Sequence, residues 1–275
     1  MNKKKIGKKR TALVLSSFVI AVLVSSLIVG AASAHMLYLE ANDKPDAPSV
    51  QAAKINFGHP NKPEGNRVPL LKEVKQYRPD GTVVDLKPIE KANYSVAYFL
   101  YQGGVHIIVA SREQSVYKGK LSKGDYGKII CCGCCEEDAA IACAEMSPWA
   151  KVTGQGLEIV PLVNPFTLRV GDTFKAALLS NGAPINGSYA AAHETKSIHN
   201  ATQAQIGDTA EDGTFSINIT ESGMWQVKAE YVIDESGTWI ATHDRVRGNT
   251  TYYLTGDEVP YDLVRYRATL TFYVP

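Results

Sequence analysis

Short runs of alternating apolar and polar residues fill most of the chain, and turn-forming residues separate one run from the next. Alternation with a period of two residues is typical of strands that bury one face. No long amphipathic helix is predicted between the runs, which favours antiparallel β-sandwiches over a parallel sheet. The predicted strands fall at 49–57, 72–78, 82–86, 94–101, 105–111, 156–162, 172–180, 187–193, 214–220, 223–233 and 265–275.

A cysteine-rich stretch at residues 119–152 separates the two sets of predicted strands. We therefore expect an all-β protein with two β-sandwich domains, at residues 35–118 and 153–275, joined by this stretch. The chain has 275 residues, which is enough for two hydrophobic cores of modest size.

Residues 1–34 have the three parts of a secretory signal peptide: a basic run, an uncharged apolar stretch and a small-residue ending with Ala32 and Ala34. Cleavage after Ala34 would make His35 the first residue of the mature protein. An uncut signal that anchors the protein in a membrane through residues 11–30 is the alternative, because this apolar run approaches the length of a membrane span. Either outcome places the rest of the chain outside the cytoplasm, as a secreted, periplasmic or cell-surface protein.

The charge of the chain excludes one class of partner. Its formal net charge is +1, with 29 basic and 28 acidic residues, and six of the basic residues lie among the first ten positions. Cleavage after Ala34 would remove those six charges and change the net charge from +1 to −5. No basic cluster remains to bind a nucleic acid, whereas an acidic exported protein is compatible with the capture of cations.

The five cysteines lie close together in the sequence, and their spacing allows two kinds of chemistry. In an exported protein they are expected to form disulfides, although an odd number leaves one unpaired. Pairs with two residues between them also suit a soft-metal or redox site with thiolate ligands. Both interpretations stay open for Cys131, Cys132, Cys134, Cys135 and Cys143.

A histidine at the amino terminus can bind a metal ion through two nitrogens, the α-amine and the imidazole Nδ1, which close one chelate ring. Because the pKa of a free α-amine is about 7.7–8.0, a metal ion can displace its proton near neutral pH. Nitrogen donors of this kind suit Ni²⁺, Co²⁺, Cu²⁺ or Zn²⁺ better than Ca²⁺ or Mg²⁺. His35 is therefore the leading candidate ligand, and His59, in a Gly-His-Pro turn, is the second. His106 and His243 are weaker candidates for the remaining position.

The sequence gives little sign of an enzyme. It contains no nucleophile elbow, no phosphate-binding loop and no pair of carboxylates at a spacing typical of acid–base catalysis. We therefore expect a protein that binds rather than catalyses.

Three stretches of the mature region resemble a known family. They are "AHMLYLEAND" at 34–43, "FGHP" at 57–60, and the long run from "GLEIVPLVNPF" at residue 156 to "YRATLTFYV" ending at residue 274. They are similar to exported proteins of unknown function described as the periplasmic component of nickel/cobalt uptake systems, the NikM-like family. The resemblance implies immunoglobulin-like or transthyretin-like sandwiches, Ni²⁺ or Co²⁺ as cargo, and a membrane metal-uptake transporter component as partner.

The same resemblance carries over to two individual histidines. The amino-terminal histidine of the family matches His35, and its Gly-His after the first long strand matches His59. Members often have another histidine after the "VKA" strand, where this chain has Tyr231, so that His106 or His243 would have to replace that ligand. Two other readings remain: a copper-binding secreted protein or oxidative enzyme that uses His35, and a structural surface module whose histidines are incidental.

Overall fold

The computed structural model describes residues 35–41, 49–58, 68–101, 103–132 and 149–275. Residues 35–275 form one compact unit. In the described ranges the regular structure is strand, apart from one three-residue 3₁₀ helix at Pro165–Thr167, so the predicted all-β fold is confirmed. These ranges contain no helix long and apolar enough to cross a bilayer. The predicted signal or anchor at residues 1–34 lies outside them.

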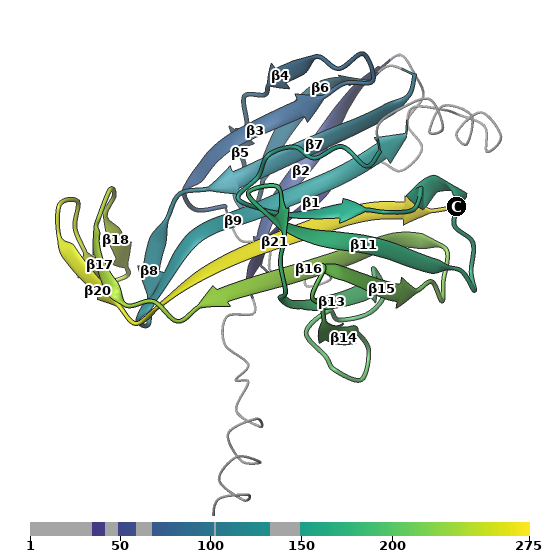
Figure 1. The fold of residues 1–275 in the computed structure, drawn as a ribbon. Helices are drawn as coiled ribbons and strands as arrows, with labels where there is room; N and C mark the ends of the chain where they lie inside the picture. Colours follow the sequence, from purple (N-terminus) through teal and green to yellow (C-terminus); the bar gives the residue numbers. More distant parts are fainter. Residues whose placement is uncertain (1–34, 42–48, 59–67, 102, 133–148) are drawn as a thin grey trace, which may run out of the picture. The chain divides into compact units, whose positions relative to one another are not determined.

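The largest sheet runs through the middle of the unit and takes strands from both halves of the sequence (Figure 1). All of its strand pairs are antiparallel except one, in which β21 pairs in parallel with β9. Its strand order is β14 (Gln205–Asp208), β13 (Ser188–His193), β16 (Gly223–Ile233), β21 (Leu263–Val274), β9 (Lys120–Cys132), β7 (Val105–Arg112), β3 (Leu71–Tyr77) and β4 (Val83–Asp85), and β8 (Ser115–Tyr117) also pairs with β9.

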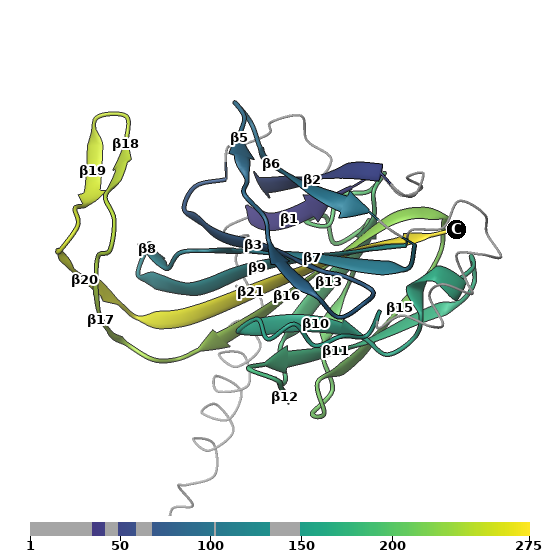
Figure 2. The ribbon, with the colours of Figure 1, turned by 90° about the horizontal axis from the view of Figure 1, so that it is seen from above.

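A smaller sheet lies on each face of this central sheet (Figure 2). The first contains β1 (Met36–Glu40), β2 (Ser49–Gly58), β6 (Ser95–Tyr101) and β5 (Ile89–Glu90), and we call it the amino-terminal sheet. The second contains β10 (Leu157–Pro161), β11 (Thr173–Ser180), β12 (Ala183–Pro184) and β15 (Thr214–Asn218), and we call it the carboxyl-terminal sheet.

Adjacent residues of β9 show how one sheet serves two cores. Ile129 belongs to the core beneath the amino-terminal sheet, and Ile130 belongs to the core beneath the carboxyl-terminal sheet. The same alternation occurs in the neighbouring strand at Ile108 and Ile107, and every residue of β7 is buried. Successive side chains of a strand point to opposite faces, so a strand covered on both faces is apolar at nearly every position. The burial of β7 at every position, with apolar residues on both faces, is therefore typical of a strand in a middle layer.

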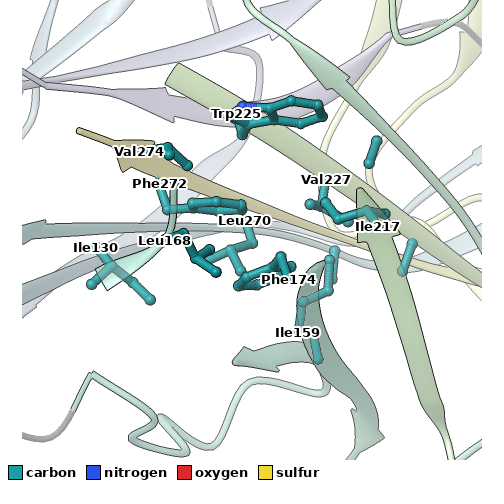
Figure 3. Packing of buried hydrophobic residues seen from close by; sticks show 14 of the residues in the cluster. Ile130, Ile159, Leu168, Phe174, Ile217, Trp225, Val227, Leu270, Phe272 and Val274 are labelled. Carbon is teal, nitrogen blue, oxygen red and sulfur yellow. The ribbon is translucent and has the colours of Figure 1, made fainter. Parts of the chain in front are cut away.

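The core on the carboxyl-terminal side is built around aromatic side chains (Figure 3). Phe174 of β11 stacks on Phe272 of β21 with ring centroids 4.4 Å apart, and Trp225 of β16 is 1% exposed. Figure 3 also shows Ile130 and Ile159 among the packed side chains, from β9 and β10 respectively. Burial of these large side chains is the main source of stability that holds the two sheets together.

A buried ion pair links the same two sheets at one side. Lys128 of β9 donates to Glu158 of β10, and both side chains are almost completely inaccessible. Glu158 also accepts from the backbone N–H groups of Thr153 and Gly154, and Lys128 donates to the Ile159 carbonyl at 3.2 Å. Burial lowers the pKa of Lys128. The pair is satisfied by several hydrogen bonds, which a charge removed from water requires.

The domain organisation differs from the one expected from the sequence. Strands of both expected domains, 35–118 and 153–275, share the central sheet, and 35–275 stays together as one unit. The expected connecting stretch, 119–152, supplies the long strand β9 near the middle of that sheet. The reason is the parallel pairing of β9 with β21, which joins segments more than a hundred residues apart and leaves no local signal.

A two-stranded arm extends from one end of the central sheet (Figures 1 and 2). It contains two short antiparallel pairs, the first between β17 (Gly237–Ile240) and β20 (Glu258–Tyr261), the second between β18 (Arg245–Arg247) and β19 (Thr250–Tyr253). Trp239 and Tyr253 of the arm pack with Val116, Leu121 and Val264 in a small core of their own.

Candidate metal-binding site

His35 is the first described residue, and its side chain is exposed at the start of β1. Its imidazole lies edge-on to the ring of Phe57 in β2, with centroids 5.8 Å apart and an interplanar angle of 73°. Its carbonyl oxygen accepts a hydrogen bond of 2.5 Å from Nη1 of Arg267 in β21. The main chain of His35 is therefore held by the central sheet, and the residue is exposed beside β2.

The β1–β2 pairing also relates His35 to the second predicted ligand. The last cross-strand pair at this end is Met36 with Gly58, and these residues directly follow His35 and directly precede His59 in the sequence. His59 itself lies outside the described residues.

A buried ionic triad of Arg112, Asp125 and Arg267 lies beneath this end of β1. Asp125 accepts from Arg267 Nε at 2.5 Å and from Nη1 of Arg112, and all three side chains are at most about a tenth exposed. Burial acts to raise the pKa of Asp125, but the two arginines outweigh it and lower the pKa to about 2. Asp125 is therefore ionised at neutral pH and holds both arginines through hydrogen bonds.

His106 is placed where it cannot easily bind an ion. The residue is fully buried, its Nδ1 is 2.9 Å from Nε2 of Gln76, and its ring stacks on Tyr101 at a centroid distance of 4.9 Å. An apolar and aromatic environment with a hydrogen-bonded imidazole is typical of a histidine that stabilises a core.

His243 lies in the arm, between β17 and β18, and not in the strands next to His35. Its ring is 5.6 Å from that of Trp239 and 5.8 Å from that of Tyr253, whose hydroxyl lies 3.4 Å from Nε2. Burial is the largest cause that lowers the pKa of His243; the charge of Glu113 opposes it, and the charge of Arg245 lowers the pKa further.

The cysteines divide between two faces of one strand. Cys131 belongs to the core under the amino-terminal sheet and Cys132 to the core under the carboxyl-terminal sheet, so the two sulfurs cannot bind one ion together. Burial raises the pKa of Cys131 to about 12, which keeps this thiol protonated. Cys134, Cys135 and Cys143 lie outside the described residues.

Two clefts on the described surface are lined by residues other than the predicted ligands. One, of about 420 Å³, lies between the body and the arm and includes Lys72, Lys123 and Trp239. Another, of about 320 Å³, includes His193 and Trp225. Across the described ranges, no three or more His, Cys, Asp or Glu side chains are grouped so as to hold a metal ion.

Sequence reasoning did not find the triad. Asp125 and Arg267 are 142 residues apart, and they meet because β9 and β21 pair in parallel with these two residues in register. A charged residue in an otherwise alternating strand, such as Arg267 in "RYRATLTFYV", was the one local signal.

Comparison with known proteins assigns the chain to a family. A family model described as a domain of unknown function, DUF4198, matches residues 32–233. The chain belongs to the DUF4198 family. No curated protein matches it.

Similar solved structures are distant. A DUF4785 family protein from Legionella pneumophila has 12% identity and a TM-score of 0.23, and the match covers 69% of this chain and 50% of that one. A mutant alpha-2-macroglobulin from Salmonella has 11% identity and a TM-score of 0.22, with 90% of this chain and 15% of that chain covered. The chain thus spans half or less of these two proteins.

Proposed function

We propose that this DUF4198 protein is a non-catalytic, extracytoplasmic carrier that captures Ni²⁺ or Co²⁺ and passes the ion to a membrane metal-uptake transporter component, as the NikM-like resemblance implies. Signal cleavage after Ala34 exposes the α-amine of His35, and the amine and Nδ1 of the same residue then bind the ion together. His59 supplies a further imidazole nitrogen.

One observation carries this proposal: His35 has an exposed imidazole on a main chain that is fixed to the central sheet. A chelating residue loses less entropy on binding when its backbone is already ordered. The pairing of Met36 with Gly58 gives further support, because it brings the chain neighbours of His35 and His59 together across two strands.

His106 and His243 are less suited to bind the ion than His35. His106 would have to leave a buried position and its contact with Gln76 to reach an ion, and His243 packs with Trp239 in the arm. We therefore propose His35 and His59 as the principal ligands, with the remaining coordination positions open to water or to the transporter. By inherent affinity Cu²⁺ binds such nitrogen sites more tightly than Ni²⁺, so the metal carried depends on availability and geometry.

The test is mass spectrometry of the exported protein, purified without chelators, followed by calorimetric titration with Ni²⁺. We expect a mature chain that begins at His35, and a His59→Ala variant with clearly weaker Ni²⁺ binding. The control His243→Gln should bind as the unmodified protein does. A chain that begins at any other residue, or equal affinities for all three proteins, would refute the proposal.

A further inference from the structure

The carbonyl groups along one edge of β1 are bound by side chains of the central sheet. Arg267 donates to the His35 carbonyl at 2.5 Å, and Thr269 donates to the Leu37 carbonyl at 2.7 Å. The two donors and the two acceptors are each two residues apart, so β1 is fixed along β21 in a single register. Two contacts that hold β1 on the central sheet therefore come from side chains that lie 232 residues later in the sequence.

The triad also contacts the ring of His35 indirectly, because Arg112 packs on Phe57 and Phe57 packs on His35. The guanidinium carbon of Arg112 lies 3.8 Å from the centroid of the Phe57 ring, and Phe57 is the residue against which His35 packs edge-on. Arg112 is itself held by Asp125 and by a 2.7 Å hydrogen bond to the Pro69 carbonyl. Asp125 is thus connected to the main chain of His35 through Arg267, and to its ring through Arg112 and Phe57.

Burying the three charged groups of the triad costs desolvation free energy. Three charged groups removed from water contribute little net stability, and a well-packed apolar set at the same place is often as stable or more so. Where buried ionic groups are retained, the best-attested role is to fix one arrangement of the chain. Here the arrangement that is fixed is that of the first residue of the compact unit.

We propose that Arg267, Asp125 and Arg112 are positioning residues that hold the amine and the imidazole of His35 in one geometry for metal binding. The inference rests on the proposed function of His35 and extends it to three side chains that contact no ion. Partners one layer behind a metal ligand commonly alter metal affinity by roughly 10- to 100-fold when they are mutated.

The experiment compares variants in mature protein that begins at His35. Arg267→Lys keeps the positive charge but cannot donate to Asp125 and to the His35 carbonyl through one planar group. Thr269→Val removes the donor to Leu37 while preserving shape, and it is the variant to use if substitution of the triad prevents folding. The matched control is Lys128→Met, which breaks a buried ion pair in the same strand as Asp125 but on the side of the carboxyl-terminal sheet.

Three quantities are measured: Ni²⁺ affinity by calorimetry, the electron paramagnetic resonance spectrum of the Cu²⁺ complex, and backbone ¹⁵N relaxation of the metal-free protein around His35. We expect Arg267→Lys to weaken Ni²⁺ binding by roughly tenfold or more, to change the Cu²⁺ spectrum and to increase motion at residues 35–37. Thr269→Val should shift the same quantities in the same direction by less. Lys128→Met should lower stability and leave all three unchanged.

The outcomes separate this proposal from the proposed function. Unchanged affinity and unchanged relaxation in Arg267→Lys, or equal changes in Lys128→Met, would overturn the positioning role. If the unmodified protein binds neither Ni²⁺ nor Cu²⁺ while Arg267→Lys still mobilises residues 35–37, the proposed function fails and the triad keeps only its control over β1.

Discussion

The shared central sheet makes a quantitative prediction for two adjacent residues of β9. Ile129 and Ile130 are 4% and 2% exposed, yet they belong to different cores on opposite faces of the sheet. Replacing either by alanine should therefore cost about 2–5 kcal/mol of unfolding free energy, the usual range for a buried isoleucine. The loss of unfolding free energy alone does not distinguish the two faces of β9. The energetic coupling of each isoleucine to a third residue does.

The partners for this comparison are Ile159 of β10 and Leu39 of β1. Ile159 shares the core of Ile130, and Leu39 shares the core of Ile129. Side chains in one packed cluster usually show interaction energies of about 0.5–3 kcal/mol, whereas residues without shared partners are additive within about 0.5 kcal/mol. We expect Ile130→Ala to couple to Ile159→Val and not to Leu39→Ala, and Ile129→Ala to show the reverse.

The assay is urea denaturation of the single and double variants, followed by tryptophan fluorescence and circular dichroism. A single transition with both probes is needed for the free energies to be comparable. Coupling of Ile129 and Ile130 to the same partner, or of neither to any partner, would refute the assignment of the two faces of β9 to two cores.

Three further predictions concern single groups. Burial lowers the pKa of His243 below 6.5, so the unfolded chain binds more protons than the folded arm at acid pH. The arm should therefore lose stability as the pH falls below about 6.5. Hydrogen exchange around Trp239 should show this loss, and His243→Gln should abolish its pH dependence. Lys128→Met leaves the buried Glu158 carboxylate without its ion pair and should cost about 3–5 kcal/mol in urea denaturation, and adding Glu158→Gln should recover part of that loss. Cys131, with a pKa raised to about 12, should resist alkylation at pH 8 until the protein is denatured, as peptide mass mapping would reveal; rapid labelling of the native protein would contradict its placement in the core.

Much of the fold was accessible from local pattern. Runs such as "TFSINIT" and "GMWQVKAEYVI" alternate as predicted and form β15 and β16. The organisation of the sheets into layers could not be predicted in this way. An alternating strand has the same sequence pattern whether its second face contacts water or another sheet. The run "VHIIVAS" was the exception, since apolar residues on both faces indicate a middle strand.

The candidate site was predictable only in part. A histidine after a small-residue cleavage motif is a local feature, so His35 could be found from sequence. The Arg267 contact to His35 depends on side chains brought together across 232 residues, and no local pattern encodes that pairing. His59 stays a prediction, because its position lies outside the described residues.

The proposed metal binding depends most on the free α-amine of His35. The direct measurement is calorimetric titration of Ni²⁺ into two proteins that begin at His35, one with a free α-amine and one in which that amine is acetylated. Loss of the amine as a ligand should weaken binding by roughly 100-fold, or about 2.8 kcal/mol, without a change in folding stability. Equal affinities for the two proteins would contradict the account, because they would show that the amine takes no part in binding.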